Sequence, residues 1–351
     1  MARRAEPEIL PEADRIEGQP HPREVFELVG HHEALARAAR AIRGGRPPQA
    51  WLIAGPSGIG KAPRAYRIAR YLLRYGATAE GPEDLSLAAN DPVSQQVGAG
   101  AHPGLLILRR AVNERTGKLM NVLSVEEVRK LSSFFGMTSG AGGWRVAIID
   151  TADDMNDAAA NALLKTLEEP PSRAMILVLS HNPGRLVSTI RSRCQRLNLR
   201  PLSDSEMEAA LEQKLPQLDD AERASLARLS GGSIGNALVL AEGEGVALAR
   251  EADRLIENAG HPDVPALLAL GDKLGRMTDG LETFGTFLAN TLSERIRSKG
   301  AVGVTGLDRW IEASEKVRSK FARSSALYLD PRQTVVSAAL ALGDAKRHGA
   351  L

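Results

Sequence analysis

The stretch that decides the fold runs from Val146 to Leu197 and reads VAIIDTADDMNDAAANALLKTLEEPPSRAMILVLSHNPGRLVSTIRSRCQRL. It predicts two buried apolar strands, 146–150 and 174–179, which are joined by a helix and followed by a short basic segment. The first strand ends in Asp150. Ligands of an open α/β sheet bind outside the carboxyl ends of its strands, so an acid there can hold magnesium for a nucleotide. The pattern therefore indicates an α/β domain with a ligand-binding edge.

The helix between these strands follows from local chemistry. Asn156 can cap it, residues 158–167 are good helix formers, and Pro170 ends it. The same region contains the block NALLKTLEEPP at 161–171, and a Ser-Arg-Cys motif follows at 192–194. This block and motif closely resemble the bacterial clamp-loader subunits of the AAA+ ATPase class.

Composition limits the classes of function. The 351 residues suffice for about two to three domains. Aromatic residues make up only 4% of the chain, which disfavours a surface that stacks many bases. Forty-five Lys and Arg residues against 43 Asp and Glu residues leave a net charge of +2, without the basic field of a dedicated DNA-binding domain. We therefore expect any DNA contact to be local or shared with partners.

Cysteine usage and hydropathy indicate the compartment. Cys194 is the one cysteine, which excludes an intramolecular disulfide and a multi-cysteine zinc site and is typical of a reducing cytoplasm. We expect Cys194 to be structural. The N-terminus carries no apolar signal-peptide core, and the chain has no run of about 18 apolar residues. The sequence predicts a cytoplasmic protein with no membrane contact.

A phosphate-binding loop is predicted near the N-terminus. A buried strand at 50–54 leads into Gly-Pro-Ser-Gly-Ile-Gly-Lys-Ala, and a helix follows from Arg64. In such a loop, glycines let backbone N–H groups turn toward phosphate oxygens, and the lysine reaches the outer phosphates. The candidate nucleotide-binding residues of this loop are Gly55, Ser57, Gly58, Gly60 and Lys61.

The loop departs from the active pattern at its last position. Ala62 stands where a Ser or Thr hydroxyl would bind magnesium, which weakens metal-assisted hydrolysis. The sequence leaves binding of ATP or ADP with Mg²⁺ open, and the alternative is a tight turn that holds no ligand. No cofactor is therefore assigned with certainty.

The family resemblance also implies a zinc module, which this chain lacks. Relatives carry four cysteines just before a His-Pro pair, and this chain keeps His102-Pro103 but has no cysteine in 76–103. The remaining polar residues of that segment do not make a tetrahedral ligand set. We therefore expect no zinc and allow for a small folded insertion.

The predicted ATPase edge is incomplete. In the resembled class an acid next to the magnesium-binding Asp activates the attacking water, but here Thr151 follows Asp150, and a threonine hydroxyl is no base at neutral pH. Asp153 is a weak substitute because it lies at a different distance and direction. At the end of the second strand, Asn182 is the candidate nucleotide-sensing residue, with a helix cap as its alternative, and His181 is expected to be a satisfied strand-end histidine.

Arg193 is the candidate catalytic residue. The resemblance implies that the arginine of the Ser-Arg-Cys motif acts in trans as an arginine finger at a neighbouring subunit's ATP site. A guanidinium stays charged and can grip two phosphate oxygens at once. The alternative is a surface arginine in an intramolecular salt bridge.

The C-terminal part is predicted to be helical. Apolar residues recur there at helical spacing, and most should be core, with one or two making subunit contacts. In the family's motors an arginine that senses the γ-phosphate stands where this chain has Gly235, so Ala62, Thr151 and Gly235 are three departures from an active ATPase. The predicted division is a flexible tail (1–22), an AAA+ P-loop α/β domain (23–201), a helical lid (202–245) and a helical collar (246–351). For the tail, the alternative is a docking peptide around Ile9-Leu10.

The resemblance, which covers the chain from about Arg23 onward, implies a role in DNA replication. The chain would be a rigid, non-hydrolysing member of a hetero-pentamer with the delta and motor (gamma/tau) subunits, which loads the sliding clamp onto primer-template DNA. The main competing hypothesis is a motor subunit that itself hydrolyses ATP. A P-loop kinase of a small molecule is disfavoured by the helical lid and collar.

Overall fold

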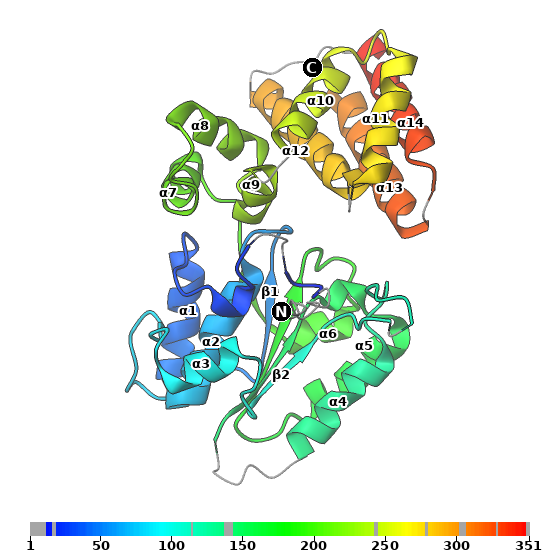
Figure 1. Ribbon diagram of the computed structural model, residues 1–351. Helices are drawn as coiled ribbons and strands as arrows, with labels where there is room; N and C mark the ends of the chain where they lie inside the picture. Colours follow the sequence, from blue (N-terminus) through cyan, green and yellow to red (C-terminus); the bar gives the residue numbers. More distant parts are fainter. Residues whose placement is uncertain are drawn as a thin grey trace, which may run out of the picture. The chain divides into compact units, whose positions relative to one another are not determined.

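The computed structural model describes residues 12–15, 19–113, 115–136, 143–241, 245–277, 280–301, 307–327 and 329–348 (Figure 1). The chain forms two compact units, Met1–Leu202 and Ser203–Leu351. The first unit is the α/β part and the second is entirely helical where it is described. The residues predicted as lid (202–245) and collar (246–351) lie, apart from Leu202, in the second unit.

The first unit is built on a five-stranded parallel sheet in the order β2-β3-β4-β1-β5. The strands are β1 Ala50–Ala54, β2 Leu105–Leu108, β3 Arg145–Ile149, β4 Ala174–Ser180 and β5 Gln195–Asn198. β1 and β4 are buried at every position, as their unbroken apolar runs predict. β5 was not predicted, because this short edge strand has exposed polar residues at three of its four positions. The α/β fold class is confirmed.

Helices cover both faces of the sheet (Figure 1). Strand side chains alternate between two apolar clusters, so each face binds its own helices. On one face lie α4 Val125–Gly136, α5 Asp157–Glu168 and α6 Ser188–Arg193, and on the other lie α1 His32–Arg43, α2 Lys61–Tyr75 and α3 Pro92–Gly98. Two short 3₁₀ helices complete the unit, η1 Pro22–Glu24 and η2 Ala152–Asp154.

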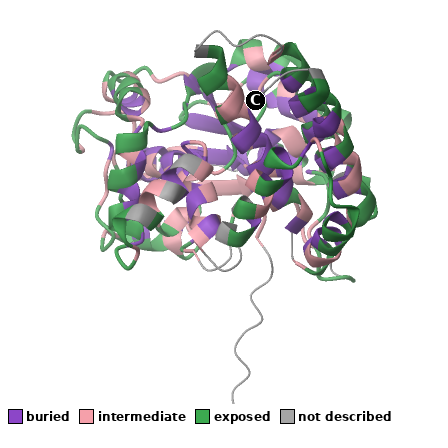
Figure 2. Cartoon of the chain, turned by 90° about the horizontal axis from the view of Figure 1, so that it is seen from above, coloured by how far each residue is buried: buried purple, intermediate pink, exposed green. Residues whose placement is uncertain are grey.

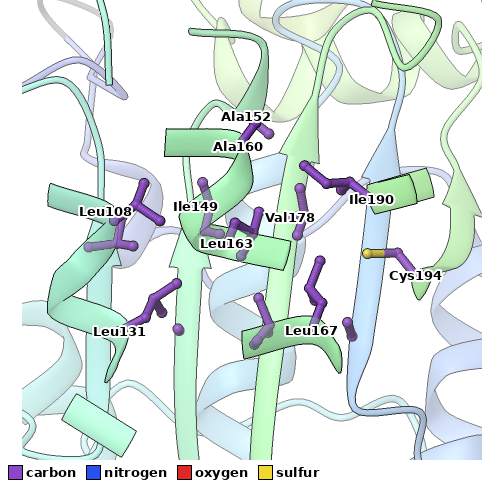
Figure 3. Close-up of a cluster of buried hydrophobic side chains, with 14 of the residues drawn as sticks. Leu108, Leu131, Ile149, Ala152, Ala160, Leu163, Leu167, Val178, Ile190 and Cys194 are labelled. Carbon is purple, nitrogen blue, oxygen red and sulfur yellow. The ribbon is translucent and has the colours of Figure 1, made fainter. Parts of the chain in front are cut away.

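The predicted α5 begins and ends as its sequence indicates. The Asn156 side chain accepts a hydrogen bond from the Ala159 amide at 2.9 Å and so caps the first turn. Leu163 is fully buried and Leu167 nearly so, and both pack on the sheet beside Ile190 of α6 (Figure 3). This packing links α5 to the helix that carries the candidate arginine finger. Cys194, next to that helix, is buried in the same cluster, and burial raises the pKa of its thiol to about 11.

The second unit contains eight helices among its described residues. Figure 2 colours the chain by burial, and its helices carry both buried and exposed residues. Trp310 and Phe284 are fully buried, whereas Leu268, Ile311 and Leu340 are exposed. No described helix of the chain is long and apolar enough to cross a membrane. The helices are α7 Asp204–Lys214, α8 Asp220–Leu229, α9 Ile234–Ala241, α10 Gly245–Glu257, α11 Val264–Arg276, α12 Gly280–Ala301, α13 Leu307–Leu327 and α14 Pro331–His348.

The predicted flexible tail, residues 1–22, includes residues that contact the rest of the first unit. Residues 12–15 and 19–22 pack on the first unit, and the side chains of Asp14 and His21 are each only 1% exposed. Arg109, which directly follows β2, donates hydrogen bonds to the carboxylates of Glu12 and Asp14. The alternative docking peptide at Ile9-Leu10 lies outside the described residues. The segment is ordered because long-range ion pairs hold it, and sequence periodicity does not report such pairs.

The insertion at 76–103 is joined to α2 by a hydrogen bond and by apolar packing. The Tyr71 hydroxyl of α2 donates to the Thr78 carbonyl at 2.9 Å. Leu85 and Val97 are buried in the core of the same face. Among the described residues, no group of three or more His, Cys, Asp and Glu side chains is arranged to hold a metal.

We expect removal of metal to leave this insertion folded. Prolonged treatment with a chelator such as EDTA should not change the melting temperature, because a hydrogen bond and apolar packing join the insertion to α2. Differential scanning fluorimetry with and without chelator measures this. Stoichiometric zinc in elemental analysis of the purified protein, or a drop in melting temperature with EDTA, would contradict the prediction.

Candidate functional site

The candidate site lies at the carboxyl edge of the sheet, where the ends of β1, β3 and β4 are adjacent. β1 leads into the loop from Gly55, β3 into Asp150, and β4 into His181 and Asn182. Three segments that lie far apart in the chain, after residues 54, 149 and 180, thus meet at one edge, as the strand pattern predicts.

The loop after β1 has the geometry of a phosphate-binding loop. It leads directly into α2, whose N-cap, Gly60, has φ of 92°. This left-handed conformation favours glycine. Gly55 is needed for a different reason, because a Cβ there would lie 2.5 Å from the Leu199 carbonyl oxygen. The predicted strand, loop and helix are therefore all present.

Lys61 points back into its own loop. Its ammonium donates to the Gly55 carbonyl at 2.8 Å and to the Pro56 carbonyl at 2.7 Å, and it lies 2.7 Å from Nδ1 of His181. Lys61 is 5% exposed, and this burial lowers its pKa to about 8 despite the nearby carboxylates of Asp150 and Asp153. An ammonium has three N–H donors, and protein atoms take all three. This arrangement does not fit a bound phosphate.

After β4, the side chain of His181 reaches the loop, and Asn182, the candidate nucleotide-sensing residue, donates its backbone amide to Asp153. His181 as a whole is exposed, but its Nδ1 is held against Lys61. Withdrawal of the ring from water, together with the charge of Lys61, lowers the pKa of His181 to about 4. The imidazole is therefore neutral at pH 7, and its Nδ1 accepts the hydrogen bond. The sequence indicated a satisfied strand-end histidine but not its partner.

Asp153 holds the end of β4 in place. Its carboxylate accepts hydrogen bonds from the Ser180 hydroxyl at 3.0 Å, the His181 amide at 2.6 Å and the Asn182 amide at 3.1 Å. These contacts give Asp153 a positioning role. With its oxygens engaged in this way, Asp153 does not fit the role of substitute catalytic base.

Asp150 and Thr151 do not form a hydrolytic pair. Burial and the nearby carboxylate of Asp14 raise the pKa of Asp150 to about 7, although Lys61 acts in the opposite direction. Thr151 is buried, and its hydroxyl lies 3.5 Å from the Asp154 carboxylate. At neutral pH Asp150 is therefore partly protonated, and the Thr151 hydroxyl beside it is no base.

The raised pKa of Asp150 predicts a pH dependence of stability. A carboxyl whose pKa is about 7 when folded and 3.8 otherwise takes up a proton on folding, so stability falls as pH rises from about 4 to about 7. Asp150→Asn removes this penalty. We expect the variant to exceed the wild type in stability at pH 8 by up to a few kcal/mol, at about 1.4 kcal/mol per pKa unit, and to match it near pH 4. Urea denaturation at both pH values measures the difference. A variant that is less stable at pH 8 would refute the argument.

Two further departures have structural roles. Ala62, in place of a magnesium-binding hydroxyl, packs against the core cluster of the α2 face. Gly235, in place of the sensing arginine, is buried on α9 of the second unit. Within the first unit, Ala62 carries no hydroxyl and Thr151 carries no carboxylate.

Arg193 lies at the end of α6 and is accessible. Its Nη2 donates to the Glu168 carboxylate at 2.8 Å, and its Nη1 donates to the Thr189 carbonyl at 3.3 Å. The Arg193 side chain is 36% exposed and that of Glu168 is 51% exposed. A salt bridge this exposed contributes about 0–1 kcal/mol, so the guanidinium can exchange Glu168 for a stronger anionic partner. The intramolecular salt bridge is thus present, and it does not exclude a role in trans.

Sequence reasoning missed three arginines on one face of α2. Arg64, Arg67 and Arg70 donate hydrogen bonds to backbone carbonyls of residues 23–30. Burial lowers the pKa of Arg70 to about 10, and its guanidinium lies 4.2 Å from the Phe26 ring centre. The available signal was that these arginines recur every third residue and so lie on one face of the helix. These contacts anchor the segment that leads to the N-terminal ion pairs.

The fold and site together define a class of protein. A parallel sheet in the order β2-β3-β4-β1-β5, with a phosphate-binding loop after β1, an acid after β3 and polar residues after β4, is an AAA+ P-loop domain. Comparison with known proteins identifies the branch of that class. Residues 30–203 match the family model described as "DNA polymerase III, delta subunit". Through these residues the chain belongs to the DNA polymerase III delta-prime family.

The curated relatives are delta-prime and gamma/tau subunits of DNA polymerase III. The delta-prime subunit of Pseudomonas aeruginosa is 36% identical over 193 residues, which are 54% of this chain and 55% of that protein. The Escherichia coli delta-prime subunit is 35% identical over 204 residues, 58% of each chain. A gamma/tau subunit of Mycobacterium bovis is 31% identical over 228 residues, 60% of this chain and 35% of that protein. The alignments with the two delta-prime proteins thus span little more than half of their length.

Proposed function

We propose that this chain is a delta-prime-like subunit of the DNA polymerase III clamp loader. In this proposal it does not hydrolyse ATP itself, and it supplies Arg193 as an arginine finger to the ATP site of a neighbouring motor subunit. The match of residues 30–203 to the family supports the assignment to the loader. Names of the relatives, delta-prime and gamma/tau, support membership of the same complex.

One contrast carries the proposal. The chain's own edge lacks catalytic groups of the motor pattern, whereas Arg193 is exposed and held by a weak surface salt bridge and one hydrogen bond to the Thr189 carbonyl. A guanidinium on a short helix that packs against the sheet core is well placed to project from the subunit. An arginine finger needs those two properties, accessibility and a rigid base.

The degenerate edge supports the absence of hydrolysis. Ala62 offers no magnesium-binding oxygen, Thr151 offers no base, and Gly235 offers no charge to a γ-phosphate. The remaining residues that we assign to the degenerate nucleotide site are Gly55, Ser57, Gly58, Gly60, Lys61, Asp150 and Asn182.

The assembly that we propose is a cytoplasmic hetero-pentamer with the delta and motor subunits, which places the sliding clamp on primer-template DNA. Residues 202–245 would form the lid and 246–351 the collar that joins the subunits. Exposed Leu268, Ile311 and Leu340 are the candidate collar contacts, because large apolar side chains on a helical surface favour association. A net charge of +2 favours DNA contact through the complex rather than by this chain alone.

The second candidate function is an ATP-hydrolysing motor subunit. Its support is the 31% identity to a gamma/tau subunit. ATP turnover by the isolated chain, with and without primed DNA and clamp, separates the two. We expect no turnover above background, and robust turnover would establish the motor instead.

A further inference from the structure

In the loop after β1, groups of the protein itself bind the ammonium of Lys61. All three donors of the Lys61 ammonium are engaged, two by carbonyls of the loop itself and the third by Nδ1 of His181. The two carbonyls belong to the same turn and move with it. The imidazole belongs to His181, which directly follows the neighbouring strand β4. It is therefore the contact that can be removed without altering the loop.

The position of His181 is imposed by the fold. Asp153 accepts hydrogen bonds from the Ser180 hydroxyl and from the backbone amides of His181 and Asn182, which fixes the chain where β4 ends. Ser180 is fully buried and pairs with Ala54 of β1. The imidazole is thus presented to Lys61 from a backbone that is anchored on two sides.

We infer that His181 determines what this loop can bind: its Nδ1 takes the place on Lys61 of a phosphate oxygen and closes the loop to nucleoside polyphosphates. The inference shares the degenerate nucleotide site with the proposed function, but it does not depend on Arg193. It assigns a specificity-determining role to a residue that the loop motif does not include.

We call the contact between Lys61 and His181 the latch. The loop and helix around the latch have other features of an anion site. Gly60 keeps the left-handed turn at the start of α2, and α2 is 15 residues long, so its N-terminal amides retain their positive potential. Removal of the imidazole would free one N–H of a buried ammonium beside that helix end. The chemical class that fits is the phosphate oxyanion of a nucleotide or of pyrophosphate.

Two substitutions at one position test the latch. His181→Ala removes the acceptor, whereas the Oδ1 atom of His181→Asn can lie near the place of Nδ1 and accept from Lys61. The full-length chain and both variants are titrated with ADP and, separately, with inorganic pyrophosphate by calorimetry without added metal. We expect His181→Ala to bind either probe about tenfold or more tightly than the wild type, and His181→Asn to bind like the wild type.

Each outcome decides the inference. His181→Ala that binds no more tightly than the wild type overturns it, and so does a wild type that already binds ADP with micromolar affinity. Equal gains in the Ala and Asn variants would also overturn it, because the hydrogen-bond acceptor would then be irrelevant. Urea midpoints of the three proteins establish that each is folded. Since the titration contains neither a partner subunit nor ATP turnover, failure of the arginine finger would leave its result unchanged.

Discussion

Replacement of Arg193 by Ala should lower DNA- and clamp-stimulated ATP turnover at the neighbouring site of a reconstituted loader about a thousandfold. The physical reason is that a guanidinium stabilises charge on the transferring phosphoryl group in the transition state. Loss of the side chain should barely change folding stability, because its partner Glu168 is 51% exposed. Steady-state phosphate release by the assembled complex measures the effect.

Two matched variants sharpen this test. Arg193→Lys keeps the charge but lacks the planar fork, so we expect most of the loss to persist. Glu168→Ala removes the intramolecular salt bridge and leaves the arginine, so turnover should be kept. Turnover that survives in Arg193→Ala complexes of normal composition would remove the finger. Loss in Glu168→Ala would instead indicate that the salt bridge positions Arg193.

Replacement of Asp14 by Ala should destabilise the first unit by about 2–3 kcal/mol at pH 7. Burial disfavours the ionised carboxyl of Asp14, but the hydrogen bond with His21 and the charge of Arg109 outweigh it and lower its pKa to about 2. Removal of the carboxylate leaves buried donors of both partners without their acceptor. Arg109 keeps Glu12, which limits the loss.

The sign of the pH dependence follows from the lowered pKa. A carboxyl with a pKa of about 2 when folded and 3.8 otherwise contributes stability above pH 4 and loses it as pH falls toward 2. The gap between the wild type and Asp14→Ala should therefore be full at pH 7 and narrow below pH 4. Urea denaturation across this range, with hydrogen exchange of residues 19–30, provides the measurement.

A matched control for Asp14 is present in the same unit. The carboxylate of Asp84 pairs with Arg67 at 3.4 Å, but its side chain is 62% exposed. Asp84→Ala should therefore cost no more than about 1 kcal/mol. Equal losses in the two variants would mean that burial is not what makes the Asp14 contacts strong.

The sequence by itself determined most of the first unit. Unbroken apolar runs at 50–54 and 174–179 identified buried parallel strands, because a strand that is covered on both faces has no polar side. Asn156 and the residues that follow it identified a helix through capping and propensity. Glycine spacing identified the phosphate-type loop, and the absence of a hydroxyl at Ala62 and of a carboxylate at Thr151 is the basis of the proposal that the chain does not hydrolyse ATP. These are local properties, and local properties are readable from one chain.

Tertiary structure decided which side chains meet. Lys61 and His181 are 120 residues apart, and only the parallel pairing of β1 with β4 brings them within hydrogen-bond distance. Arg109 and Asp14 are 95 residues apart and form an ion pair. Because composition does not reveal such a pair, the N-terminal segment was predicted to be a flexible tail. A long-range electrostatic contact joins only two residues that are distant in the sequence. It therefore leaves no periodic pattern there. That is why the sequence located the loop and the sheet edge, and only the fold showed that Lys61 contacts His181 there.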